Sequence, residues 1–482
     1  MTRAPSGSRL RRWARHWGLG AILLVAAVVY GASLGSYRML MWDEAEYATL
    51  ARAVARGDGF VGYNGPERLR PPLLPLAGAV AIGLRGTADD RAVGWATVAL
   101  ALLALSVVYA AAAIAYDAAT GVLAAGLLAT APWFWGATAN FLSEIPLLAW
   151  FAAALFCWHF GLERESRWFY GAWLCAGLAL LTRYTALLLL PLFLLLTLAA
   201  ATTAGARRLD RHFLLAPLLG LLAVAPWLLR QALLFGDPMI GVWRAGGQLQ
   251  SYMPGVSMPA TFYLTQLPAM LSVPFAMLLV AGVLWALWRG DRLALDCVLV
   301  VLFILGWFGW YRYKEQRLIT AMLPACAVLG AAFVTRGLLG GRRMPPLAAL
   351  ALVALLGLAN APGMRHRFAT VHTLGAPSLV EAMAFVRAHS PDDARLIGAS
   401  APQIRWYADR AVQSFPPREQ LSALLAAADW VVITNFERGQ PDYVAELAAA
   451  IPPAAFADGS AHRFDDQHGY RTIVVRPAVF HR

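Results

Sequence analysis

Carboxylate side chains gather at one point near the start of the chain, where Asp43, Glu44 and Glu46 follow Trp42. They come shortly after the first long apolar segment, residues 17–34. A carboxylate at a lipid–water boundary is partly desolvated, which makes it more basic and suits it to general-base catalysis. The alternative is structural, because residues 45–56 are typical of an amphipathic surface helix and acids favour helix N-termini. Spacing alone leaves both interpretations open.

A second acid, Glu144, is the single carboxylate between the apolar segments 118–135 and 146–162. It is expected to emerge on the same membrane face as Asp43. Two carboxylates on one face are typical of acid/base chemistry or of a divalent cation held by oxygen ligands. The alternative is that Ser143 and Glu144 begin a helix with Pro146 in its first turn. A divalent cation at Asp43 and Glu144 is left open, and no other cofactor is indicated.

Basic side chains are expected on that same face, where short loops of membrane proteins usually carry few of them. Arginine binds phosphate oxygens in a bidentate manner, and tyrosine hydroxyls can add further donors. Pairing with nearby acids such as Glu67 and Glu315, or with ordinary lipid phosphate, is the alternative for each cation. The set consists of Arg70, Arg183, Arg312, Lys314 and Arg317, with Tyr184, Tyr311 and Tyr313 beside them.

The elements that must position these residues are membrane helices. Of 482 residues, 59% are hydrophobic and 14% charged, against about 25% charged in soluble domains. Apolar segments long enough to cross a bilayer recur along the chain. A run of 36 residues, 168–203, is too long for one crossing, and Arg183 lies at its middle, so we expect the chain to turn there. Eleven spans are predicted, at residues 17–34, 92–115, 118–135, 146–162, 168–181, 185–203, 213–229, 270–288, 293–310, 318–335 and 346–361.

The distribution of charged residues predicts on which side of the membrane each loop lies. With the N-terminus inside, basic clusters fall on the cytoplasmic side and acids on the opposite side, as the positive-inside rule requires. The net charge of +12 therefore reflects membrane orientation, and no nucleic-acid partner is expected. The shorter apolar segment 71–84 is expected to be interfacial or re-entrant. The inner clusters include Arg9, Arg11, Arg12, Arg15, Arg164, Arg167, Arg207, Arg208, Arg211, Arg289, Arg292, Arg336, Arg342 and Arg343.

Two domains follow from this division. Residues 1–363 form a membrane domain with outer loops 35–91 and 230–269, and residues 364–482 form a small extracytoplasmic α/β domain. In the latter, strands are predicted at 394–398, 430–434 and 472–475, and helices at 378–388 and 441–450. The expected fold is a mainly α, polytopic membrane protein with a small α/β domain.

The ordered set of motifs resembles the GT-C membrane glycosyltransferases, most closely the protein O-mannosyltransferases and the lipid A aminoarabinose transferases. The resemblance covers roughly residues 17–361. The motifs are Trp42-Asp43-Glu44-Ala45-Glu46-Tyr47, Arg70-Pro71-Pro72-Leu73, Ser143-Glu144-Ile145-Pro146, Leu180-Leu181-Thr182-Arg183-Tyr184-Thr185, and Glu315-Gln316-Arg317-Leu318 leading into Leu323-Pro324-Ala325.

The resemblance implies transfer of a sugar from a polyprenyl-phosphate carrier to an extracytoplasmic glycan, lipid or protein, at a bacterial inner membrane. Asp43 matches the acid that activates the acceptor, with Glu44 beside it, and Glu144 matches the acid of the second outer loop. Arg70 matches a basic residue, often lysine in relatives, that holds donor phosphate. The other expected phosphate ligands are Arg183, Tyr184, Tyr313, Lys314 and Arg317.

The main alternative function is a polytopic transporter or lipid flippase. Such proteins tend to carry internal repeats and charges near the bilayer centre. The later spans of this chain do not repeat the first five, and its candidate charges lie at one interface. The sequence therefore favours the enzyme.

Overall fold

The structure is a computed structural model that describes residues 16–35, 39, 41–204, 210–251, 256–373, 377–436 and 440–481. Arg9, Arg11, Arg12, Arg15, Arg207 and Arg208 lie outside the described residues. The chain divides into two compact units. The first consists of Met1–Gly35, Arg68–Leu74 and Gly94–Phe368, and the second of Ser36–Glu67, Pro75–Val93 and Ala369–Arg482.

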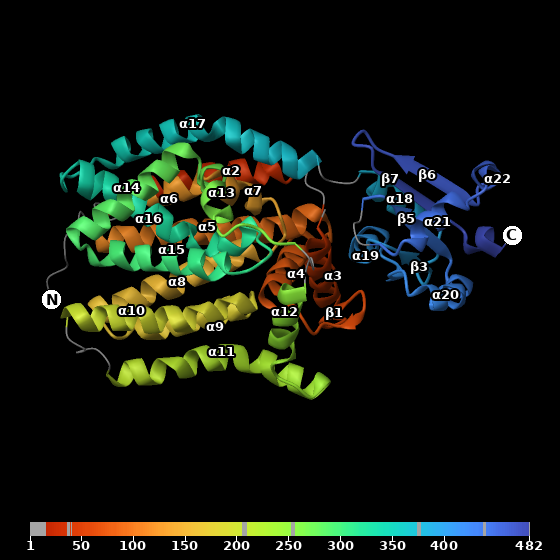
Figure 1. The fold of residues 1–482 in the computed structure, drawn as a ribbon, viewed down its shortest axis with the longest axis horizontal. Helices are drawn as coiled ribbons and strands as arrows, with labels where there is room; N and C mark the ends of the chain where they lie inside the picture. Colours follow the sequence, from red (N-terminus) through yellow and green to blue (C-terminus); the bar gives the residue numbers. More distant parts are fainter. Residues whose placement is uncertain are drawn as a thin grey trace, which may run out of the picture. The chain divides into compact units, whose positions relative to one another are not determined.

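The first unit is helical (Figure 1). Its apolar stretches form helices because a backbone in lipid must satisfy its hydrogen bonds internally. The helices are α2 (Trp17–Ser33), α5 (Asp90–Ala115), α6 (Ala118–Ala129), α7 (Pro132–Thr138), α8 (Glu144–Glu163), α9 (Trp168–Leu180), η1 (Tyr184–Leu188), α10 (Leu189–Ala204), α11 (Arg211–Phe235), α12 (Ile240–Ser251), α13 (Phe262–Leu271), α14 (Val273–Arg289), α15 (Arg292–Gly309), η2 (Gln316–Met322), α16 (Leu323–Ala332), η3 (Phe333–Leu338) and α17 (Pro346–Thr373).

Every predicted span coincides with helix. In the described part of the chain, seven helices are long and apolar enough to cross a membrane, and nine spans result if each bent pair counts as one. The bends are 68° between α6 and α7 and 118° between α13 and α14. The other two predicted spans, at residues 17–34 and 168–181, fall on α2 and α9, which with 17 and 13 residues are too short to count among these. The prediction of a polytopic, mainly α protein is confirmed.

The core of this unit lies around α16, in which all ten residues are buried. Close packing there depends on small residues: a Cβ added at Gly282 of α14 would lie 2.7 Å from the carbonyl oxygen of Leu329. In contrast, α11 exposes a row of leucines, including Leu218, Leu222 and Leu233. Exposed apolar side chains in a row are expected where a helix faces lipid rather than protein.

The second unit contains a small mixed sheet with helices packed on it (Figure 1). The strand order is β4-β3-β5-β7-β6, in which β4, β3 and β5 are parallel and β7 and β6 antiparallel to their neighbours. The strands are β3 (Arg395–Gly398), β4 (Ala411–Gln413), β5 (Trp430–Thr434), β6 (Ala461–Asp465) and β7 (Arg471–Val475). The helices are α18 (Pro377–Ala388), α19 (Ala401–Ala408), η4 (Arg418–Gln420), α20 (Leu421–Ala427), α21 (Tyr443–Ala449), α22 (Pro453–Ala457) and η5 (Pro477–His481).

The same unit includes the segment predicted as the first outer loop. It forms α3 (Trp42–Arg56), the short hairpin of β1 (Val61–Gly62) and β2 (Gly65–Pro66), and most of α4 (Leu73–Arg85). The helix predicted at residues 45–56 is therefore present and begins three residues earlier. The three predicted strands and two predicted helices of the C-terminal segment are also present. The sequence interpretation missed β4, β6, α19, α20 and α22.

Candidate functional site

An ion pair joins two predicted site residues in the first unit. Arg183 Nη1 lies 2.6 Å from Glu144 Oε1 and 3.4 Å from the Ser143 hydroxyl. The Glu144 side chain is 5% exposed and that of Arg183 22%. The second carboxylate oxygen of Glu144, Oε2, is buried without a hydrogen-bond partner. Glu144 thus begins α8, as the structural alternative supposed, and also holds the guanidinium of Arg183.

The position of Arg183 follows from the break in the apolar run. Helix α9 ends at Leu180, and Arg183 has an extended backbone with φ −159° before the 3-10 turn η1 begins. A guanidinium in the middle of a continuous helix would be placed at mid-bilayer, at a cost of about 3 kcal/mol or more. The predicted turn at Arg183 is therefore confirmed, and it leaves the side chain beside the first turn of α8.

The segment that carries Arg70 lies against this break. The backbone N–H of Leu73 donates to Leu181 O at 2.9 Å. The side chain of Gln231 in α11, which is fully buried, donates to Arg68 O at 3.1 Å. These two hydrogen bonds, one on each side of Arg70 in the sequence, fix the backbone of residues 68–73 between α11 and the end of α9. Arg70 is thereby placed in the same part of the first unit as Arg183.

Tyr184 follows Arg183 and is held by its hydroxyl group, which accepts a hydrogen bond from Trp227 Nε1 at 3.1 Å. Gly241 of α12 lies directly against the same ring. A Cβ at position 241 would be 2.1 Å from the Tyr184 hydroxyl, so any larger residue would displace the ring. A tyrosine fixed in this way is pre-organised to bind a ligand without further loss of side-chain freedom.

Residues just before η2 and in its first turn form a second group with local partners. Tyr313 donates to Glu315 Oε1 at 2.8 Å, and Arg317 pairs with the other oxygen of Glu315. Lys314 is 3% exposed and donates to the carbonyl oxygens of Met258, at 3.0 Å, and Tyr311. Local pairing, the alternative for these cations, is thus seen for Arg317, while Lys314 joins two loop segments. Because η2 packs against α8, this group belongs to the same unit as Glu144.

The acids of α3 lie in the second unit. Glu44 is 1% exposed, and its Oε2 accepts a hydrogen bond from the backbone N–H of Met41 at 2.9 Å. This contact satisfies a backbone group at the start of α3, which is the capping role that the structural alternative supposed. Asp43 is less buried than Glu44. Of the two neighbouring acids, Asp43 is therefore the one that solvent or a ligand can reach.

The same segment contains two buried carboxylates that the sequence interpretation did not single out as a pair. Glu46 is 2% and Glu67 7% exposed. Both lie beside Gly62: a Cβ there would be 2.5 Å from Glu46 Oε1 and 3.6 Å from Glu67 Oε2. Gly62 is thus required by the close approach of the Glu46 side chain, and the hairpin of β1 and β2 covers these acids.

A buried charge network in the first unit was also missed. His159 Nδ1 lies 2.7 Å from Asp296 Oδ2, and Arg292 Nη2 lies 3.0 Å from Asp296 Oδ1. His159 lies within the apolar segment 146–162. Its pairing with Asp296 joins α8 to α15, and the i,i+4 spacing of Arg292 and Asp296 is the one signal in the sequence that could have indicated it.

In the part of the chain that the structure describes, the candidate site residues do not gather into a metal-binding cluster. Among the described residues, no group of three or more His, Cys, Asp and Glu side chains is placed to hold a metal ion. The side chains at Glu144 instead form an arginine–carboxylate pair. The roles proposed below for these residues therefore include no metal ligand.

Comparison with known proteins finds a family match for part of the chain and matches in fold for most of it. Residues 69–229 match the family described as dolichyl-phosphate-mannose-protein mannosyltransferase. No curated protein matches the chain in sequence. Solved structures do match it in fold. The structure of ArnT from Cupriavidus metallidurans in the apo state has a TM-score of 0.72 at 17% identity, covering 95% of this chain and 98% of that one.

Two further structures contain lipid phosphates. ArnT from the same organism bound to undecaprenyl phosphate has a TM-score of 0.70 at 16% identity, covering 94% of this chain and 97% of that one. The archaeal oligosaccharyltransferase AglB from Archaeoglobus fulgidus, in complex with an inhibitory peptide and a dolichol-phosphate, has a TM-score of 0.60 at 14% identity, covering 87% and 69%. The fold expected from the resemblance is confirmed.

Proposed function

We propose that this chain is a membrane glycosyltransferase of the GT-C class that uses a lipid-phosphate sugar donor. The family match of residues 69–229 and the fold shared with ArnT support this proposal. A sugar moves from a polyprenyl-phosphate carrier to a hydroxyl or amine of an extracytoplasmic glycan, lipid or protein. The acceptor atom attacks the anomeric carbon, and the bond from that carbon to the phosphate oxygen breaks on the opposite face. The product has inverted configuration, and polyprenyl phosphate leaves.

Asp43 acts as the base in this proposal. Its carboxylate accepts the proton of the acceptor as the new bond forms, a contribution of about 10²–10⁴-fold in such reactions. Its support is that Asp43 is the more accessible acid of α3, whereas the Glu44 carboxylate is occupied with the helix start. Glu44 then keeps α3 in register and takes no proton.

Arg183 and Arg70 stabilise the departing phosphate. The observation that carries this proposal is the Arg183–Glu144 pair: among the described residues, Arg183 contacts its partners Glu144 and Ser143 through Nη1 alone. Its Nε and Nη2 groups are therefore available to a phosphate oxygen, and Glu144 fixes their direction. Pre-organised cations of this kind act where negative charge develops.

Glu144, Tyr184, Tyr313, Lys314 and Arg317 have supporting roles. Glu144 orients Arg183, and Tyr184 presents its hydroxyl beside the break that follows α9. Arg317 and Tyr313 share Glu315, so a phosphate that displaced Glu315 would gain both donors. Lys314 keeps the loops around residues 258 and 311 together through its two carbonyl contacts.

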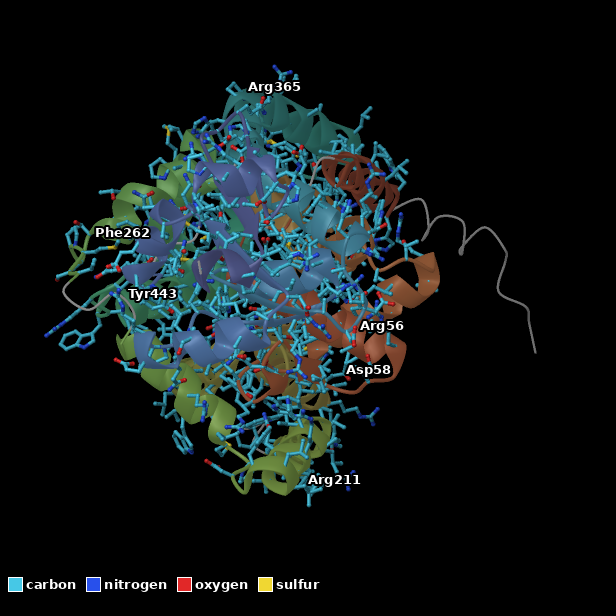
Figure 2. All side chains as sticks on the ribbon, turned by 90° about the vertical axis from the view of Figure 1, so that its right-hand side faces the viewer. Arg56, Asp58, Arg211, Phe262, Arg365 and Tyr443 are labelled. Carbon is cyan, nitrogen blue, oxygen red and sulfur yellow. The ribbon has the colours of Figure 1, made fainter. Side chains whose placement is uncertain are left out.

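The test is transfer by purified protein in lipid nanodiscs. Polyprenyl-phosphate sugars of several kinds are supplied with candidate acceptors, and release of polyprenyl phosphate is measured. We expect release from at least one donor, a loss of about 100-fold or more in Asp43→Asn, and wild-type rates in the matched control Asp58→Asn. Asp58 is an exposed acid that follows the end of α3 and appears beside Arg56 in Figure 2. Near-wild-type transfer by Asp43→Asn would show that Asp43 is not the base.

The proposed location is the inner membrane of a bacterium, with the N-terminus in the cytoplasm and residues 364–482 outside. Its support is that the helix ends at Arg211, Arg289 and Arg292 carry basic residues, as cytoplasmic ends do. Reporter fusions that are active only in the cytoplasm or only outside it, placed after residues 290 and 482, test the orientation. An external reporter that is active after residue 290 would contradict it.

A further inference from the structure

The second unit contains a contact between helix α3, which carries Asp43, and helix α19 of the C-terminal segment. Arg52 of α3 is 5% exposed. Its guanidinium donates to Trp406 O at 2.8 Å and to Arg405 O at 2.7 Å, and lies 3.3 Å from Asp409 Oδ1. These carbonyls belong to the last turn of α19, where Arg405 O also accepts from the backbone N–H of Asp409 at 3.2 Å. A buried cation on α3 therefore satisfies the end of α19.

Asp409 strengthens this contact from the other side. It ends α19 in the left-handed conformation, with φ 54°. Both its oxygens accept from Arg56, at 3.1 and 2.6 Å, in a bidentate pair. Burial would raise the pKa of Asp409, but the hydrogen bond from Arg56 and the charge of Arg52 outweigh it and hold the pKa below its ordinary value. Burial lowers the pKa of Arg52 to about 10, so it stays charged at neutral pH.

The same helix also contacts the residues that flank α3. Tyr407 accepts a hydrogen bond from the backbone N–H of Met39 at 2.8 Å. Asp90, which is 7% exposed, accepts from Trp406 Nε1 at 2.6 Å and from the Tyr407 hydroxyl at 3.0 Å. One turn of α19 thus binds α3 and the segments before and after it. Each of these contacts joins residues more than 300 positions apart.

The N-terminal end of α3 is held independently. Trp42, the residue before Asp43, packs against the apolar core of the C-terminal segment. Its ring also makes an edge-to-face contact with Tyr63, with 5.7 Å between ring centroids. Trp42 and Arg52 are ten residues apart, which is about 15 Å along a helix. Contacts at two such points fix both the direction and the rotation of α3.

We propose that α19 positions the acid-bearing helix, so that the C-terminal segment is a working part of the transferase rather than an appended binding domain. Arg52, Asp409, Asp90, Trp406 and Tyr407 are positioning residues: they touch no substrate and act through the placement of Asp43. The proposal rests on the proposed function only where it assigns the proton transfer to Asp43. A misplacement of about 1 Å in a reacting group can cost about 100-fold in rate.

The test uses Asp409→Asn and Arg52→Gln in the full chain. Asparagine tolerates the left-handed conformation, so Asp409→Asn removes the charge with little change in backbone preference. The matched control is Asp392→Asn, because Asp392 lies 3.0 Å from buried Arg410 of the same segment. Hydrogen exchange of residues 42–56 reports the contact without any need for activity. The single-turnover rate constant reports chemistry and does not depend on the folded fraction.

We expect exchange in α3 to rise at least about tenfold in both variants, and the single-turnover rate constant to fall about 10–100-fold. The donor concentration at half-maximal rate should stay within about threefold, since neither substituted residue is one of the proposed donor phosphate ligands. The control should match the wild type in all three measurements. Unchanged exchange in both variants would overturn the proposal, as would raised exchange with a wild-type rate constant.

A wild-type protein that released no polyprenyl phosphate from any donor would refute the proposed function instead. The exchange measurement would still decide whether α19 holds α3. If Arg52→Gln fails to fold, Arg52→Lys takes its place, because lysine can keep one of the carbonyl contacts and should give an intermediate effect.

Discussion

Separating Glu144 from Arg183 should destabilise the first unit unequally, depending on which partner is removed. Arg183→Gln leaves a carboxylate that is 5% exposed, with one oxygen already lacking a partner. Removing one member of a buried pair costs about 3–5 kcal/mol. We expect the lower end, about 3 kcal/mol, because the Arg183 side chain is 22% exposed and water reaches part of the site.

Glu144→Gln should cost less, about 1.5 kcal/mol, since it removes a charge-assisted hydrogen bond but leaves a cation that water can reach. In the double variant Glu144→Gln/Arg183→Gln, two amides replace two charges, and no unpaired carboxylate remains. The double variant should therefore be more stable than Arg183→Gln alone, with a coupling of about 2 kcal/mol.

The assay is thermal unfolding in nanodiscs at one scan rate, because membrane proteins often unfold irreversibly. At about 2 °C per kcal/mol for a large domain, Arg183→Gln should lower the midpoint by roughly 6 °C and the double variant by less. A double variant that is less stable than either single variant, with additive losses, would refute the coupling. All three variants should lose transfer activity, because Arg183→Gln and the double variant remove the guanidinium and Glu144→Gln removes the carboxylate that fixes its direction.

Three further outcomes follow from the structure. Asp409→Asn should lower the unfolding midpoint at pH 7, because the pKa of Asp409 is held below its ordinary value of about 3.9 in the folded state. This stabilisation is complete above the ordinary pKa and is lost as the pH falls through the lower pKa of the folded state, so the midpoints of wild type and variant should begin to converge below about pH 4. Gly220→Ala should cost about 1–3 kcal/mol, because the added Cβ would lie 2.7 Å from Trp173 O, whereas the control Gly20→Ala has nothing within 4 Å and should not destabilise. Lys314→Met should cost about 1–3 kcal/mol by leaving two carbonyls unpaired, and an unchanged midpoint would contradict the role of Lys314 between the loops.

Local patterns were sufficient to predict the apolar helices of the first unit and the main strands of the second. A stretch of about 20 apolar residues has few stable alternatives to a helix in a bilayer, so the spans could be read directly. The turn at Arg183 was equally predictable, because a charge at mid-bilayer is costly wherever the rest of the chain lies. The strand at 430–434 was visible as a short run of β-branched residues.

The two missed strands of the C-terminal segment have a common cause. β4 (Ala411–Gln413) has three residues and β6 (Ala461–Asp465) carries alternating polar side chains at the sheet edge. Neither shows the apolar run by which β5 was recognised. Such strands exist because a neighbouring strand offers backbone hydrogen bonds, and that condition does not appear in their own residues.

The sequence by itself determined which residues could do chemistry and which segments would lie in lipid. It also indicated that Arg183 must leave the helix. Only the tertiary structure decided which charged side chains are partners. It pairs Glu144 with Arg183 and Glu315 with Arg317, and it places Arg52 against the end of α19. The physical reason is the separation along the sequence over which each effect acts. Apolar periodicity and turn preference act over a few residues, whereas the partner of a buried charge depends on the path of the whole chain. Arg52 and Trp406, separated by 354 positions, meet only because the C-terminal segment folds against α3.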